Sequence, residues 1–244
     1  MAHDALWPQR RHALVADMYH CLCYRTYLIV KRAMDAVIAA VALVCLWPLL
    51  LLIAIRIRLD SPGPAIFTQP RVGVRWRARG LSHEWEVVTF GCHKFRTMAH
   101  CCDQSMHEAF IRAFVAGEVD ASQETGMPFK LKEDPRVTRA GQWLRQTSLD
   151  ELPQLFNVLR GEMSLVGPRP VPLYEAAAYK MWHRERLHAL PGITGLWQVK
   201  GRSRVSFDEM ARLDIEYVRH PSLLTDLKLL LVTIPAVLST RGAR

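Results

Sequence analysis

The stretch that decides the fold is AMDAVIAAVALVCLWPLLLLIAI, residues 33–55. Asp35 is its only charged residue, and as a straight helix it would reach about 35 Å, enough to cross the hydrocarbon core of a bilayer. The run is too long for the core of a signal peptide and lacks a cleavage pattern, so we expect it to be retained. These features predict a membrane helix within residues 27–60, which ends where Ser61, Pro62, Gly63 and Pro64 follow.

Both flanks of this run are basic, with Arg25, Lys31 and Arg32 before it and Arg56 and Arg58 after it. Basic flanks favour the cytoplasmic side of a membrane. Inside the run, Pro48 lacks a backbone donor and clashes with the preceding turn, which favours a kink or a break in the helix. A re-entrant helical hairpin fits both observations, and a single spanning helix with a mild kink remains the alternative.

Composition bounds the rest of the chain. Half of the 244 residues are hydrophobic, enough for a substantial core, and the net charge of +9 suits an anionic membrane, a phosphorylated substrate or nucleic acid. The six cysteines form no CxxC pair, which argues against a structural zinc site and for free thiols. Since neither an RNP sequence nor a helix-turn-helix pattern is present, we expect no nucleic-acid partner.

Outside the apolar run, the sequence predicts a mainly helical α+β fold with a small sheet. AIFTQ (65–69), EWEVVTF (84–90) and HKFRTM (93–98) are typical of short strands. Residues 107–116 form an amphipathic helical pattern, and residues 223–238 are apolar but interrupted, as in a helix packed in the core or lying on the membrane. We therefore expect one catalytic domain over residues 61–244.

The block DPRVTRAGQWLRQTSLDELPQLFNVLRGEMSLVGPRP covers residues 134–170. It contains an apolar helical face, ended by Gly161, made of Leu152, Leu155, Phe156 and Leu159. Pro153 then belongs in the first turn of that helix. Ser148 and Glu151 have the spacing of a capping box, in which the serine hydroxyl and the glutamate satisfy each other's backbone N–H groups.

The adjacent carboxylates Asp150 and Glu151 stand near that helix start. On their own they are best explained as capping groups that complement the helix dipole. The block also carries many cations, however: Arg136, Arg139, Arg145, Arg160 and Arg169. A carboxylate among arginines is favoured in its ionised, nucleophilic form, and a second carboxylate could help to hold Mg²⁺ against phosphate oxygens.

Two turns rich in Pro and Gly follow. GPRP (167–170) is a rigid turn that would project Arg169 in a fixed direction, as phosphate binding requires, although a purely structural turn fits equally well. PGITG (191–195) predicts a second turn, LWQV (196–199) a short strand, and Gly201 with Arg202 a loop.

Five segments together strongly resemble the bacterial sugar transferase family, the monotopic polyprenyl-phosphate phosphoglycosyl transferases. They are KRAMDAVIAA, HKFRTM, the block 134–170, PGITGLWQVKGR and DLKLLLVTIPAVLS. The resemblance extends from about Tyr27 to the C-terminus, while residues 1–26 match no pattern and read as a basic lead-in. It implies a re-entrant helix hairpin broken at Pro48, with the soluble parts on the cytoplasmic face of the bacterial inner membrane.

The resemblance also implies a reaction. Asp150 would attack the β-phosphate of a UDP-sugar, releasing UMP and leaving a sugar-phosphoryl aspartate, and undecaprenyl phosphate would then take the sugar phosphate. The diphosphate-linked lipid formed in this way would begin the synthesis of a lipid-linked glycan, such as an exopolysaccharide, capsule, O-antigen or glycoprotein glycan.

Site residues carried over from the family resemblance are Glu151 as the Mg²⁺ ligand and Lys94, Arg145 and Arg169 as phosphate-binding groups. Arg96, Arg136 and Arg202 are further phosphate-binding candidates. Without the resemblance, Lys94 reads as a solvated strand residue and Arg202 as a loop charge. Residues 100–127 look longer than the family core and are assigned no function.

Two other classes of function are weighed against this one. A membrane glycosyltransferase that moves the sugar alone would release UDP in place of UMP. A non-enzymatic, membrane-anchored binding module would not need Asp150. The sequence leaves open which hexose is used, which glycan is built and whether the chain forms a homo-oligomer.

Overall fold

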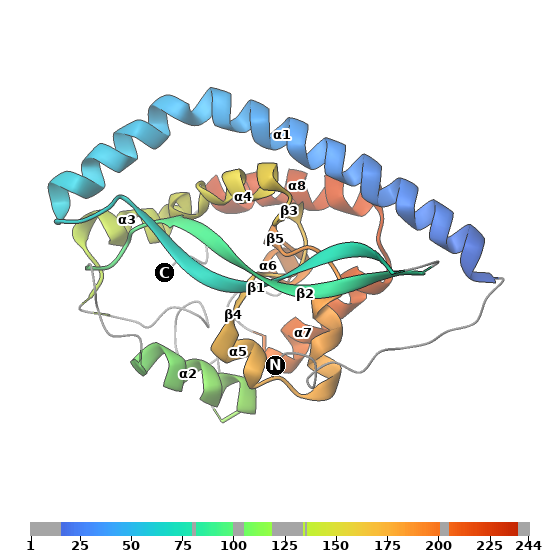
Figure 1. Cartoon of the computed structure of the whole chain (residues 1–244). Helices are drawn as coiled ribbons and strands as arrows, with labels where there is room; N and C mark the ends of the chain where they lie inside the picture. Colours follow the sequence, from blue (N-terminus) through green and yellow to red (C-terminus); the bar gives the residue numbers. More distant parts are fainter. Residues whose placement is uncertain are drawn as a thin grey trace.

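The computed structural model describes residues 16–79, 82–99, 105–118, 134, 136–200 and 205–238. A long helix, α1 (Ala16–Asp60), arches over a mixed body that begins with the strands β1 (Ile66–Arg79) and β2 (Ser82–Phe95) (Figure 1). The remaining elements are α2 (Ser105–Ala116), α3 (Arg139–Thr147), the 3-10 turn η2 (Leu149–Glu151), α4 (Gln154–Arg160), β3 (Ser164–Val166), β4 (Val171–Pro172), α5 (Leu173–Ala177), the 3-10 helix η3 (Met181–Leu187), β5 (Gly192–Thr194), α6 (Leu196–Lys200), α7 (Phe207–Arg219) and α8 (Leu223–Leu238). The predicted fold, mainly helical with a small sheet, is confirmed.

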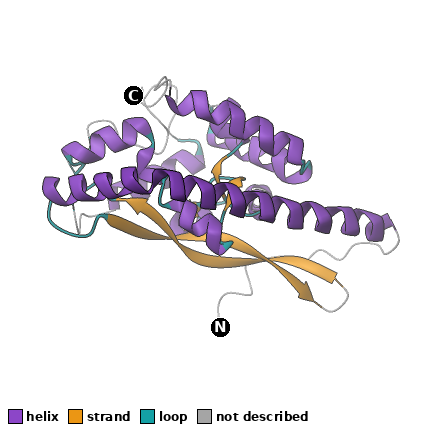
Figure 2. Cartoon of the chain, turned by 90° about the horizontal axis from the view of Figure 1, so that it is seen from above, coloured by secondary structure: helices purple, strands orange, loops and turns teal. Residues whose placement is uncertain are grey.

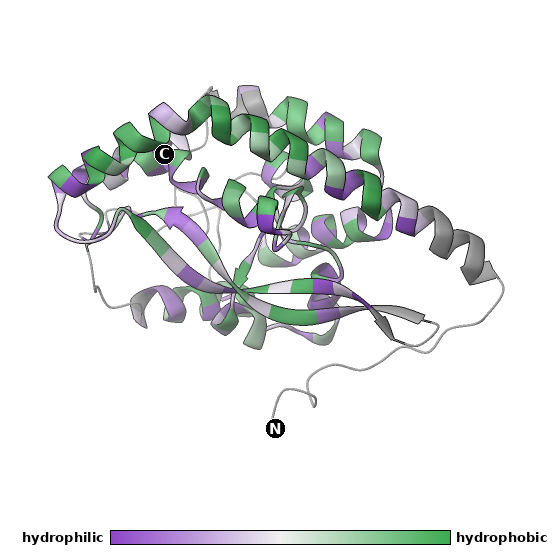
Figure 3. Cartoon of the chain, turned by 45° about the horizontal axis from the view of Figure 1, so that its top comes forward, coloured by the Kyte–Doolittle hydropathy of each residue, from purple (hydrophilic) through white to green (hydrophobic). Residues whose placement is uncertain are grey.

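Helix α1 carries the apolar run, and by length and composition it could cross a membrane. Val37, Val44 and Leu52 are among its many exposed apolar residues, and Figure 3 shows hydrophobic residues along much of α1 and α8. The helix continues through Pro48, so an interruption there is not observed. A missing N–H at one position bends a helix without ending it when apolar helix formers continue on both sides, and α1 is accordingly an arch (Figure 1).

The first arm of α1 is fixed to the body by buried polar groups. The Asp35 carboxylate accepts a hydrogen bond from the Ser164 hydroxyl (2.7 Å), which explains the one charge in the apolar run. Lys31 donates to Asp226 of α8 (2.9 Å), and Tyr217 of α7 donates to the same carboxylate (2.7 Å). Asp35 and Asp226 are 1% and 0% exposed. Removal of Lys31 would therefore leave the buried charge of Asp226 uncompensated.

The last arm is fixed by Arg96, at the end of the KFR segment. Its guanidinium donates to the Ser61 carbonyl (2.7 Å) and to the Pro62 carbonyl, which follow α1. Asp60 in turn accepts from the backbone N–H of Ala140 in α3 (3.0 Å). Arg96 is only 4% exposed and donates to carbonyls that follow α1, which gives it a structural role. Its role in phosphate binding stays a prediction.

Beneath α1 runs the hairpin of β1 and β2 (Figure 2). The two strands are antiparallel over 14 residues each, with Phe67 opposite Lys94 and Val74 opposite Val87. The predicted strands at AIFTQ and EWEVVTF are confirmed, and the first three residues of HKFRTM continue the same strand as EWEVVTF. Met98 forms only an isolated bridge with Val137. Strand β4 pairs with β1 at Arg71 and Val72, which places the GPRP turn against the sheet.

The two turns rich in Pro and Gly meet each other, because β3 and β5 pair in parallel. The Gly167 N–H donates to the Thr194 carbonyl (2.9 Å), and the Gly192 N–H donates to the Pro168 carbonyl (2.8 Å). A Cβ atom at Gly192 would lie 2.1 Å from the Gly167 nitrogen, so a side chain there would force the turns apart. Arg169 thus projects from a turn that is braced on both sides.

The prediction of a strand at LWQV was wrong, since these residues form helix α6. The neighbouring residues Leu196 and Trp197 are both buried, whereas alternate residues of a strand would face opposite sides. Val199 closes a helical turn by donating to the Gly195 carbonyl (3.2 Å).

Helices α2 and α7 pack against each other below the sheet. Ile111 and Phe114 of α2 are 0% and 1% exposed, and the Phe114 ring meets the Phe207 ring edge to face at 5.8 Å. The amphipathic pattern predicted at 107–116 is therefore confirmed as a core-facing helix. Helix α8 has one buried and one exposed face. Leu229 packs in the core beside α1, while Leu231 is 69% exposed.

Candidate active site

The two carboxylates lie in a sharp change of direction between α3 and α4. Ser148 ends α3 in the left-handed conformation (φ 57°), and Asp150 and Glu151 follow in the 3-10 turn η2. The predicted capping box was wrong, because the Ser148 side chain makes no cap hydrogen bond in this conformation. Pro153 precedes α4 as its N-cap, and Gly161 ends α4 at φ 78°, the latter as predicted.

Glu151 forms an ion pair with Lys94 of β2, with 2.7 Å between Nζ and Oε1. The side chain of Lys94 is 19% exposed and that of Glu151 is 23% exposed, so the pair faces a partly open surface. The reading of Lys94 as a solvated strand residue is therefore wrong.

Asp150 is 6% exposed and lies within electrostatic range of Arg145, near the end of α3. Burial lowers the pKa of Arg145, whereas the negative charge of Asp150 raises it, so each charge stabilises the other. The charge of Arg145 therefore acts at the residue predicted to be the nucleophile.

Arg136 is already engaged by a neighbour. It donates from Nε and Nη2 to both oxygens of Asp134, at 2.8 and 2.7 Å. This bidentate contact holds the pKa of Asp134 below its ordinary value. Arg136 therefore contributes to the field around Arg145, with most of its own charge balanced by Asp134.

Arg71 of β1, which sequence reasoning missed, stands behind the GPRP turn. Its guanidinium donates to the Pro170 carbonyl (3.0 Å) and to the Gln69 side chain (2.6 Å). Burial, and next the positive charge of Arg169, lower the pKa of Arg71. The sequence gives only one weak indication, a charged residue directly before the apolar Val72. That pattern is more typical of a solvated position in a strand.

The two halves of the site meet around Cys92 of β2, which is completely buried. Burial raises the pKa of its thiol, while the nearby positive charges lower it and the charge of Glu151 raises it. The cations that act on this thiol are Lys94, Arg71 and Arg169. The ion pair of Glu151 and the arginine of the GPRP turn therefore lie within electrostatic range of one point on β2.

The carboxylate of Glu151 suits a hard cation such as Mg²⁺, which proteins commonly bind through one or two carboxylates while substrate phosphates supply further oxygens. Over the ranges that the structure describes, no cluster of three or more His, Cys, Asp or Glu side chains forms a complete metal site. Arg202 lies outside the described residues.

Comparison with known proteins identifies the family of the chain. The model of the family described as bacterial sugar transferase matches residues 26–240. The chain belongs to the bacterial sugar transferase family. The resemblance predicted from the motifs is confirmed.

Among the relatives of this sugar transferase is the exopolysaccharide production protein ExoY of Rhizobium meliloti, 41% identical over 87% of both chains. The galactosyl transferase CpsE of Streptococcus agalactiae is 39% identical over 90% of this chain and 44% of its own length. The undecaprenyl-phosphate galactose phosphotransferase of Salmonella typhimurium is 39% identical over 91% of this chain and 43% of its own length. The chain therefore spans less than half of the latter two proteins.

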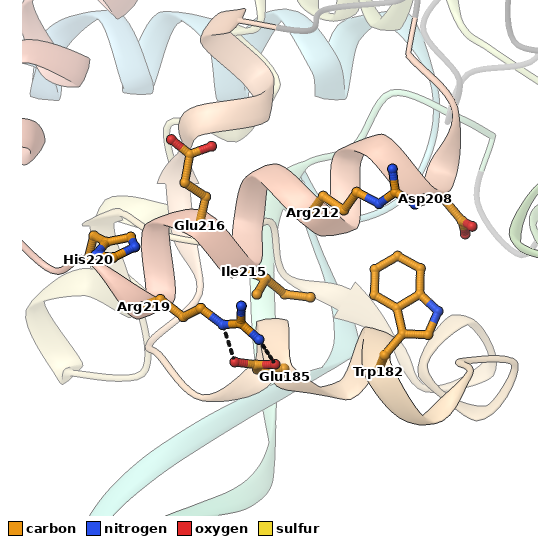
Figure 4. A pocket seen from close by; sticks show the side chains of 8 residues that line it. All are labelled: Trp182, Glu185, Asp208, Arg212, Ile215, Glu216, Arg219 and His220. Atoms are coloured by element: carbon orange, nitrogen blue, oxygen red, sulfur yellow. Dashed lines mark hydrogen bonds and ion pairs between the residues drawn. The ribbon is translucent and has the colours of Figure 1, made fainter.

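The sugar transferase also has a cavity of about 470 Å³ between η3 and α7 (Figure 4). Trp182 and Arg212 line it together with charged pairs such as Arg219 and Glu185, whose atoms lie 2.7 Å apart. None of the predicted site residues lines this cavity. Its carboxylates, Glu185, Asp208 and Glu216, form ion pairs with Arg219, Lys180 and Lys200. We therefore place the chemistry at Asp150 and Glu151 rather than here.

Proposed function

We propose that this protein transfers a sugar 1-phosphate from a UDP-sugar to undecaprenyl phosphate and releases UMP. The observation that carries the proposal is the position of Asp150, within electrostatic range of Arg145 and directly before Glu151, which pairs with Lys94. Arg169 of the GPRP turn and Lys94 both act on Cys92 of β2. The product would be the first lipid-linked intermediate of a glycan. The names of the Salmonella relative, an undecaprenyl-phosphate galactose phosphotransferase, and of ExoY, an exopolysaccharide production protein, support this proposal.

In the first step, an Asp150 oxygen forms a bond to the β-phosphorus of the donor, and the bond from that phosphorus to the bridging oxygen breaks. UMP leaves with the electron pair, and the sugar phosphate remains on Asp150. Arg145 and Arg169 would balance the negative charge on the phosphoryl oxygens. Mg²⁺, held by Glu151 when bound, would neutralise further phosphate charge.

In the second step, a phosphate oxygen of the acceptor forms a bond to the same phosphorus and the bond to Asp150 breaks. The carboxylate is restored, and the sugar is left on a lipid diphosphate. Lys94 can exchange its contact with Glu151 for one with a phosphate oxygen as substrates come and go, because both side chains are partly exposed.

We infer that α1 enters one leaflet and returns, which keeps the body on the cytoplasmic face of the inner membrane. The support is that both arms of α1 bond to the same body: Lys31 and Asp35 near its start, and Asp60 near its end. A spanning helix would place its two flanks on opposite sides of a hydrocarbon core about 30 Å thick. Basic residues at both ends support the same arrangement.

The proposed function is tested by nucleotide release from a panel of UDP-hexoses, with detergent-solubilised protein and undecaprenyl phosphate, in the presence and absence of Mg²⁺. We expect UMP, and only with the metal. Release of UDP would instead identify a glycosyltransferase that moves the sugar alone. No nucleotide release from any donor would favour the non-enzymatic binding module.

A further inference from the structure

Helix α2 belongs to the segment 100–127, to which the sequence assigned no function. It lies on the side of the sheet away from α1 (Figure 1). Its inner face is firmly packed, since Ile111, Phe114 and Val115 are at most 2% exposed. A side chain near the start of α2 is therefore held in a defined position relative to β1 and α5.

His107, in the first turns of α2, lies within electrostatic range of the arginines around the active site. Its pKa is lowered by burial, its own backbone carbonyl raises it, and the charges of Arg71, Arg169 and Arg145 lower it further. The imidazole is thus neutral at pH 7. Its Nδ1 atom is buried and makes no hydrogen bond to another described residue.

Tyr174 of α5 is the neighbour of His107, with ring centroids 6.2 Å apart at an interplanar angle of 65°. Burial raises the pKa of its phenol, while the charge of Arg71 and a hydrogen bond from Gln69 lower it. A neutral imidazole and a neutral phenol therefore stand side by side next to Arg71, on the side of the arginines away from the membrane helix.

We propose that His107 and Tyr174 contact the hydroxyl groups of the donor hexose and help to determine which hexose is accepted. The inference rests on the proposed function and deepens it. The arginines are suited to the phosphates, and in the proposed membrane arrangement the acceptor lipid would approach from the side of α1. Two uncharged hydrogen-bonding groups on the remaining side match neutral hydroxyls better than a phosphate.

The test uses UDP-glucose and UDP-galactose, which differ only in the orientation of one sugar hydroxyl. For the full chain in detergent with undecaprenyl phosphate and Mg²⁺, kcat/KM for UMP release is measured with each donor. If only one is turned over, the inhibition constant of the other replaces its KM. We expect His107→Ala to lower kcat/KM for the better donor about 10- to 100-fold, and to bring the two donors within about threefold of each other.

Three variants complete the design. His107→Gln keeps a side-chain donor and acceptor and should recover part of the preference. Tyr174→Phe keeps the ring and removes the hydroxyl, so it tests the same contact if His107→Ala does not fold. Arg112→Ala is the matched control on α2, because its side chain is 66% exposed and lies 3.9 Å from Glu108; it should leave both donors unchanged.

The outcomes separate the two proposals. UMP release with an unchanged preference in His107→Ala and Tyr174→Phe would overturn the sugar contact and leave the proposed function standing. An equal loss for both donors would assign these residues to the uridine or to the fold, and also overturn it. Failure of the unaltered protein to release UMP from any UDP-hexose would overturn the proposed function itself, and the sugar contact with it.

Discussion

Ser148 is the only residue other than glycine with a positive φ angle among those that the structure describes. This conformation strains a residue that has a Cβ atom, by roughly 1 kcal/mol. It ends α3 and redirects the chain two positions before Asp150, so the proposed nucleophile is positioned by a turn and not by a regular helix. The strain is therefore located where the chemistry needs a special backbone path.

Substitution of Ser148 tests this link between backbone and chemistry. Ser148→Gly should keep UMP release and raise the free energy of unfolding by up to about 1 kcal/mol, because glycine accepts a positive φ. Ser148→Val should lower that free energy by about 1–2 kcal/mol and slow turnover as well. Thermal unfolding and UMP release measured together check both. Equal behaviour of the two variants would contradict the role of the turn.

Asp150→Asn should abolish UMP release while leaving the melting temperature nearly unchanged, because an amide of the same shape cannot serve as the anionic nucleophile. Glu86→Gln is the control, since it removes a carboxylate that pairs with Arg77 on the exposed hairpin. Full turnover by Asp150→Asn would refute the covalent mechanism, whatever the control shows.

Removal of the metal should stop UMP release, and Glu151→Gln should raise the Mg²⁺ concentration for half-maximal rate by about tenfold or more. The amide keeps one oxygen ligand but loses the charge that attracts a divalent cation. Titration of Mg²⁺ after treatment with EDTA measures this. An unchanged titration curve would indicate that Glu151 pairs with Lys94 and does not bind the metal.

At the scale of elements, Arg96 separates stability from catalysis. Arg96→Met removes the guanidinium that donates hydrogen bonds to the carbonyls following α1. The variant should therefore lower the free energy of unfolding by about 2–4 kcal/mol. UMP release at low temperature should survive, because no substrate contact is lost. Arg58→Met, at an exposed position in the last turn of α1, is the control for loss of a basic charge. Loss of turnover without loss of stability would restore Arg96 to the phosphate-binding set.

The sequence predicted elements better than the contacts between them. The apolar run, the helix that ends at Gly161 and the amphipathic α2 are local patterns, so each could be predicted. The 3-10 turn that holds Asp150 could not, because Ser148 gives no sign of a left-handed conformation. Arg71 lies in β1 and Arg96 directly follows β2, and only tertiary packing decides that Arg96 caps the end of α1 and Arg71 braces the GPRP turn.

For the whole molecule, the body holds both arms of α1, and this should outweigh the bend at Pro48. Pro48→Leu alone should therefore leave the N-terminus on the cytoplasmic side. Pro48→Leu combined with Asp35→Leu removes the bend and the bond to Ser164, and should expose part of the N-termini on the far side. Labelling of an introduced N-terminal cysteine from each side measures the result. Inversion by Pro48→Leu alone would contradict this account.

Attachment at both ends of α1 also sets the geometry in which the protein meets its acceptor. In the proposed arrangement, with α1 in one leaflet, the body remains at one depth between turnovers and searches for the proposed lipid acceptor in two dimensions. Its rate should follow the number of acceptor molecules per unit area of membrane and not their concentration in the total volume. Adding inert lipid to vesicles at a fixed amount of protein and undecaprenyl phosphate should slow the reaction through surface dilution alone.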